Sequence, residues 1–207
     1  MKNESKSWKI FLEGRLAQEE ERFNDALNHY NEVLQIDPEH GFANVTKGCV
    51  LARLDQTVES NQIFDELFSM FHKDKDIIKR YRAIAALSNK GFHLTSKKMF
   101  IQAVKVYDEL IVNFFDDVDL SIRYRVFLAM LNKINILRKI DENLFGEEYL
   151  KVAQDYLATN PEILNHKAPP VYDDNLIAKK YTKLTQLDLD KNGEWVDMLK
   201  VLIEEVS

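Results

Sequence analysis

A glycine recurs three times along the chain, each time 16 residues before an aromatic residue. The first two glycine–aromatic pairs are 34 residues apart, and the third pair follows after a further 43 residues. A fixed period of this length indicates that similar structural units are stacked side by side. The three pairs are Gly14 with Tyr30, Gly48 with Phe64, and Gly91 with Tyr107.

A small residue stands four positions before each of these aromatic residues, at Ala26, Ser60 and Ala103. Residues four apart lie on one face of a helix, so the spacing predicts a helical hairpin in each unit. A glycine on the first helix and a small residue on the second let the two backbones approach closely. We expect the aromatic ring to fill the space between one hairpin and the next, because a single hairpin cannot bury its own apolar face.

Apolar residues recur with helical spacing over almost the whole chain, and proline marks two of the helix ends. Glycine and proline together number 10 of 207 residues, which argues against an all-β fold and against a glycine-rich phosphate loop. The links between the predicted helices are short, so consecutive helices should pack as antiparallel neighbours. The predicted helices span about 8–19, 24–36, 41–54, 56–72, 75–94, 97–114, 118–139, 143–159, 174–187 and 194–206.

The first unit, with Gly14, Phe23, Ala26, Tyr30 and Pro38, resembles the tetratricopeptide repeat, whose period is 34 residues. It departs from that family at the signature tryptophan, and the later units match less fully. The resemblance covers residues 8–161 and implies an all-α fold. We expect a right-handed superhelical solenoid of three to four hairpins over residues 1–161. Residues 162–207 would add a loop and two C-terminal capping helices packed on the same solenoid.

The resemblance also implies a concave groove lined by the first helix of each hairpin, which receives a peptide or helix of another protein. The mixed lining suits an amphipathic or hydrophobic segment better than a strongly acidic tail. A chaperone-type carboxylate clamp is not expected, because most of its positions are changed here. The predicted groove residues are Trp8, Phe11, Arg15, Gln18, Phe42, Val45, Cys49, Arg53, Ala85, Ser88, Asn89, Phe92 and Thr95.

Charge and cysteine content narrow the class of protein further. The formal net charge of −6 does not favour a general nucleic-acid binder, and the single cysteine suits a reducing compartment. Because no secretory signal or membrane-length apolar run is visible, a cytoplasmic location without membrane contact is expected. A basic set near the predicted helix at 75–94 is interpreted as a solvated face. The alternative is a patch for an acidic partner or for nucleic acid, formed by Lys73, Lys75, Lys79, Arg80, Arg82, Lys97 and Lys98.

A possible calcium loop begins at Asp188 and follows the first half of the EF-hand pattern, in which oxygen ligands recur at alternate positions. Leu199 stands where the bidentate glutamate belongs, so affinity for calcium should be poor. The alternative is an ordinary turn and helix cap, since Asp, Asn and Gly favour both. The candidate ligands are Asp188, Asp190, Asn192 and Glu194.

No catalytic motif is visible, and the five histidines are scattered without metal-ligand spacing. We therefore expect a non-enzymatic adaptor or scaffold that binds another protein through the groove, with no cofactor unless the 188–199 loop holds calcium. Three alternatives stay open. They are a dedicated secretion-type chaperone that dimerises in the absence of its substrate, a calcium-gated regulatory binder, and an RNA-associated helical-repeat protein. Self-association is compatible with the first of these.

Overall fold

The computed structural model describes residues 2–140 and 145–165, and this part of the chain is all-α. The eight helices predicted up to residue 159 are confirmed with small shifts at their ends. The first begins earlier than expected, and the segments predicted at 174–187 and 194–206 lie outside the described residues. The helices are α1 (Lys2–Glu19), α2 (Phe23–Ile36), α3 (Gly41–Arg53), α4 (Thr57–Phe71), α5 (Ile77–Ser96), α6 (Phe100–Phe114), α7 (Leu120–Ile140) and α8 (Phe145–Thr159), followed by the short 3₁₀ helix η1 (Pro161–Asn165).

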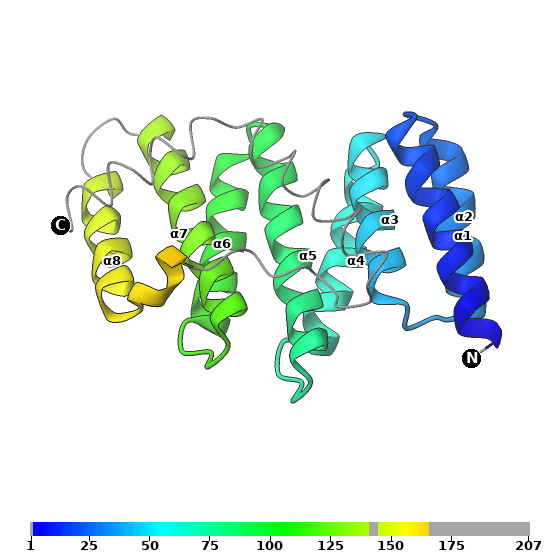
Figure 1. The fold of residues 1–207 in the computed structure, drawn as a ribbon. Coiled ribbons are helices and arrows are strands. Elements are labelled where there is room, and N and C mark those ends of the chain that lie inside the picture. The colour runs from blue at the N-terminus through cyan, green and yellow to red at the C-terminus, as the bar shows by residue number, and fades with distance from the viewer. Residues whose placement is uncertain (1, 141–144, 166–207) are drawn as a thin grey trace. The chain divides into compact units, whose positions relative to one another are not determined.

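The chain divides into two compact units, Met1–Phe114 and Phe115–Ser207. In the first unit α1 to α6 form three antiparallel hairpins that follow one another in chain order, and α3 also packs against α5 (Figure 1). In the second unit α7 packs against α8, and η1 contacts both helices. This arrangement is consistent with a helical repeat. The superhelix and the domain boundary at residue 161 stay predictions.

The three hairpins of the first unit share one turn. Glu21, Asp55 and Lys98 each adopt a left-handed backbone, with φ of 58°, 61° and 60°. They stand 34 and 43 residues apart, which are the spacings of the repeated glycines. The amide that follows each of them donates to a carbonyl five residues earlier, a pattern that ends a helix tightly. These bonds run from Arg22 to Ala17, from Gln56 to Leu51 and from Met99 to Leu94.

The close approach at each repeated glycine is made by the aromatic ring of its own hairpin, whereas the ring was expected to fill the space between one hairpin and the next. A Cβ atom at Gly14, Gly48 or Gly91 would lie 2.7 Å from the ring of the aromatic residue 16 positions later. Each ring therefore lies directly over the glycine of its own hairpin, a packing that any side chain at the glycine would obstruct. The rings of Tyr30, Phe64 and Tyr107 and the small residues Ala26, Ser60 and Ala103 are all buried.

The helix ends follow from local chemistry. Asp37, held extended before Pro38, ends α2, and α8 ends at Thr159 shortly before Pro161. Asp76 caps α5 by accepting a hydrogen bond from the Ile78 amide at 2.8 Å. Such a cap satisfies one of the amides that a helix start leaves without an intrahelical acceptor.

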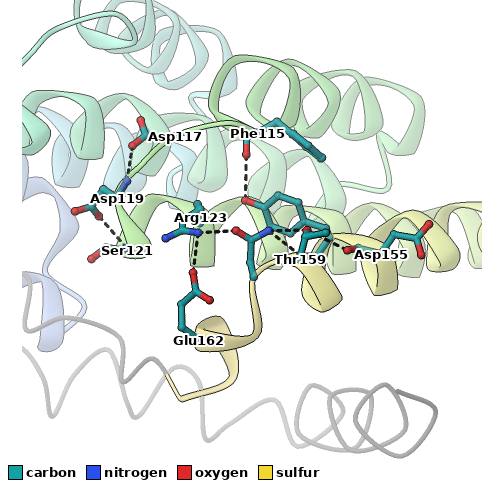
Figure 2. Close-up of polar contacts among 10 residues, drawn as sticks. Phe115, Asp117, Asp119, Ser121, Arg123, Asp155, Thr159 and Glu162 are labelled. Atoms are coloured by element: carbon teal, nitrogen blue, oxygen red, sulfur yellow. Dashed lines mark hydrogen bonds and ion pairs between the residues drawn. The ribbon is translucent and has the colours of Figure 1, made fainter. Parts of the chain in front are cut away.

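A polar cluster links α7 to η1 in the second unit where α8 ends (Figure 2). Arg123 of α7 donates to Asn160 Oδ1 at 2.6 Å and pairs with Glu162 of η1 at 2.7 Å. Tyr156 donates to the Phe115 carbonyl at 3.3 Å, and burial raises the pKa of its phenol to about 12. The cluster fixes the turn into η1 against α7. Because α7 contains no glycine, this hairpin lacks the ring contact of the other three.

Candidate functional site

The residues predicted to line a groove lie on the first helix of each hairpin in the first unit. On each helix they follow the three- and four-residue spacing of a single face. Trp8 of α1 contacts Phe42 of α3, with 5.5 Å between ring centroids. Since α3 packs against α5, the three rows of side chains are neighbours. Their partly or fully exposed members are termed the first-helix face: Trp8, Arg15, Gln18, Phe42, Val45, Cys49, Arg53, Ala85, Ser88, Asn89, Phe92 and Thr95.

Phe11 was predicted to contact a partner, but its ring is fully buried, with 0% of its surface exposed. It packs among other aromatic rings at centroid distances of 5.3 to 5.9 Å. Phe11 lies beneath the first-helix face and belongs to the hydrophobic core. Its neighbours are Trp8, Tyr30, His40 and Phe42.

His40 belongs to this aromatic cluster, and sequence reasoning did not single it out. Its Nδ1 accepts a hydrogen bond from the Ala43 amide at 3.2 Å and so caps α3. Burial lowers the pKa of His40 below its ordinary value of 6.5, and the positive charge of Arg82 acts in the same direction, against the opposing effect of Asp37. The neutral imidazole is the form that can accept this bond. The sequence feature that could have indicated this role is the position of His40 directly before a predicted helix start.

Gln18 and Thr95, two further predicted groove residues, act on buried tyrosines. The Tyr30 hydroxyl donates to Gln18 Oε1 at 2.9 Å, and Thr95 lowers the pKa of the Tyr107 phenol, which burial raises. Both partners stand four residues after a repeated glycine. The middle hairpin has Phe64, which carries no hydroxyl, and Ala52 at the matching position. The two hairpins that bury a tyrosine hydroxyl therefore carry a polar residue at this position, and the hairpin that buries a phenylalanine carries an alanine.

Ser88 and Asn89 donate to carbonyls of their own helix, Ile84 at 2.8 Å and Ala85 at 3.0 Å. One helical turn beyond them, Phe92 projects from α5 with 60% of its surface exposed. It is the largest exposed side chain of this row. A phenyl ring left in water at this extent offers apolar area to a partner.

Cys49 lies between two arginines, Arg15 of α1 and Arg53 of α3. Burial raises the pKa of the Cys49 thiol to about 11, although both guanidinium groups act in the opposite direction. The thiol is therefore protonated at neutral pH and is not activated as a nucleophile. Arg15 also approaches Gln18 Oε1 at 3.4 Å, whereas the Arg53 side chain is exposed. These two cations are the charged residues of the first-helix face.

The basic set near the start of α5 forms contacts within the chain. Lys79 pairs with Asp74 at 3.7 Å, and Arg80 donates to the carbonyls of Asp74 and Lys75. Arg82 donates to the Glu39 carbonyl at 3.2 Å. Three cations of the set are therefore held by contacts within their own chain.

No helix in residues 2–140 and 145–165 has both the length and the apolar character needed to cross a membrane. Over the same ranges, no cluster of His, Cys, Asp and Glu side chains is arranged to hold a metal ion. The predicted calcium ligands Asp188, Asp190, Asn192 and Glu194 lie outside the described residues.

No protein-family model matches the chain, and no curated protein matches it.

Proposed function

We propose that this chain is a tetratricopeptide-like interaction protein that binds a segment of another protein on its first-helix face and has no catalytic role of its own. The repeated glycine contact and the shared left-handed turn support a repeat of this kind. In such arrays the first helices of successive hairpins present one continuous surface. The partner is expected to be an amphipathic segment.

The observation that carries this proposal is the exposure of Phe92 in the middle of a row of small and polar side chains. Covering the exposed part of a phenyl ring removes roughly 120 Å² of apolar surface from water, which stabilises a complex by about 3 kcal/mol at most. That is the size of contribution that a single aromatic anchor makes in a protein interface. Phe92 is therefore the residue on which we expect a partner to dock.

The charges of the face specify the partner further. Arg15 and Arg53 flank Cys49, and the face carries no acidic side chain among its members. A carboxylate on the bound segment would pair with the exposed Arg53, while an apolar side chain of the segment covers Phe92. Two such anchors on one amphipathic segment fix its direction along the face.

The test is affinity capture from the native cell, followed by quantitative mass spectrometry. The bait is the full chain as wild type, as the double variant Arg53→Glu with Phe92→Ala, and as a matched control. The control is Lys105→Glu with Val112→Ala, which makes the same kinds of change at exposed positions of α6. Circular dichroism establishes that all three baits are equally helical.

We expect a partner that is captured by the wild type and the control but depleted at least tenfold with the face variant. That partner is then mapped to the segment that binds, which should contain both an apolar and an acidic residue. Equal capture by all three baits would move the site away from the first-helix face and refute the proposal.

A further inference from the structure

The side of α1 opposite the hairpin core carries a stripe of exposed residues. Lys9, Leu12, Leu16 and Glu19 follow one another at intervals of three, four and three residues, which places them along one line of the helix. Leu12 is 41% exposed and Leu16 is 50% exposed, and they stand one turn apart. These four residues are termed the outer stripe of α1.

The outer stripe shares no residue with the first-helix face. The buried side of α1, which includes Ile10, Phe11 and Ala17, faces the core of the first unit. At 100° per residue the centre of the outer stripe lies roughly half a turn away from the centre of this buried side. Trp8 and Arg15 lie between the two sides. The inference from the outer stripe therefore does not depend on the function proposed above.

The charges of the outer stripe are arranged so that the stripe can pair with the same stripe on a second copy of the chain. Lys9 stands three residues before the leucine pair, and Glu19 stands three residues after it. The midpoint of the stripe is at the level of Gly14. If two copies of α1 pack antiparallel about a twofold axis at that level, Leu12 meets Leu16 and Lys9 meets Glu19. A twofold axis repeats both contacts.

Other arrangements of the same two helices are less favourable. Parallel packing would set lysine against lysine and glutamate against glutamate, and like charges that face each other are repulsive. An unrelated helix would need leucines and both charges at matching positions, whereas a second copy supplies them in any case.

We propose that α1 pairs antiparallel with α1 of a second copy of this chain through the outer stripe, forming a homodimer. Two leucines per copy cover far less than the roughly 800 Å² per partner of a standard interface. The dimer is therefore weak and forms only at high protein concentration.

The test is sedimentation equilibrium of the full chain from about 10 μM to about 1 mM, a range chosen for weak interfaces. Three charge variants are compared with the wild type: Lys9→Glu, Glu19→Lys, and the exchange of both. Each single variant sets like charges against each other twice in the dimer and should weaken association roughly tenfold. The double exchange restores opposite charges and should restore association.

An equimolar mixture of the two single variants is the decisive sample. In the mixed dimer, the glutamate introduced into one copy faces the lysine introduced into the other. The unchanged Glu19 of the first copy likewise faces the unchanged Lys9 of the second, so association should return to the wild-type level. The variant Leu12→Gln should abolish association, whereas Val112→Gln, on α6, should leave it unchanged. Circular dichroism controls for folding in every sample.

Three results would overturn the proposal. The wild type could stay monomeric at about 1 mM, where a weak dimer must be visible. The single variants could associate as the wild type does, which would move the contact away from the outer stripe. The mixture could fail to recover association, which would exclude the antiparallel arrangement.

Discussion

Replacing Gly48 with alanine tests the packing of the middle hairpin directly. The new Cβ would lie 2.7 Å from Cε1 and 2.9 Å from Cζ of Phe64, whereas carbon atoms pack at about 3.5–4.0 Å. The ring is fully buried and has to shift within a filled interior. Overpacking of this kind costs about 1–3 kcal/mol, while alanine in place of glycine within a helix contributes about 1 kcal/mol of stability. We expect the free energy of unfolding to fall by about 1 kcal/mol on balance.

A second background isolates the cause of this loss. Phe64→Leu removes the ring atoms that the alanine Cβ would meet, at some cost in stability of its own. In that background Gly48→Ala has the helix-propensity gain and little of the clash. The effect of Gly48→Ala on the free energy of unfolding should therefore change sign. It should be destabilising beside phenylalanine and stabilising by up to about 1 kcal/mol beside leucine.

The assay is urea unfolding followed by tryptophan fluorescence. The chain has two tryptophans, so a Trp195→Phe background leaves Trp8, which contacts Phe42 of α3, as the reporter of the first unit. Four proteins complete the cycle: the background, each single variant and the double variant. If Gly48→Ala has the same effect beside Phe64 and beside leucine, the ring contact does not explain the repeated glycine and the reasoning is wrong.

Three further predictions concern other parts of the molecule. Glu21→Gly should raise the free energy of unfolding by about 0.5–1 kcal/mol in urea titrations because glycine relieves the left-handed backbone, while Glu13→Gly within α1 should lower it by about 1 kcal/mol. Burial lowers the pKa of His40, so the unfolded chain binds the proton more readily. Stability should fall as the pH drops below about 6.5, with a smaller fall for His40→Asn, and a urea midpoint that does not change from pH 7.5 to 5.5 would contradict this. Arg123→Met removes the bond to Asn160 and should speed amide hydrogen exchange at the end of α8 roughly tenfold, whereas unchanged exchange would show that the cluster does not hold this turn.

The helices and the glycine contacts could be predicted from sequence because each depends on local spacing. Gly14 and Tyr30 stand in the same relation as Gly91 and Tyr107, and a close approach is the physical use of a glycine inside a helix. The shared turn could not be recognised in this way. Glutamate, aspartate and lysine occupy its left-handed position, where glycine would have been the signal.

The candidate site was predicted only in part. Helical spacing shows which side of a helix a residue occupies, but not how deeply its side chain is covered by the next helix. Phe11 therefore proved to be core. Gln18 proved to accept a hydrogen bond from the Tyr30 hydroxyl, a role that depends on the identity of a residue 12 positions further along. His40 was missed because its importance comes from the rings that surround it.

The pairing of a buried tyrosine with a polar residue in two of the hairpins also bears on how three similar hairpins assemble correctly. If α6 paired with α3 during folding, the Tyr107 hydroxyl would lie against the methyl group of Ala52 with no acceptor there. A buried hydroxyl that lacks its partner costs about 1–3 kcal/mol. Misassembly of neighbouring units is a characteristic failure of repeat chains. We therefore expect a single oxygen atom, present on Tyr107 and absent from Phe64, to disfavour the pairing of α6 with α3.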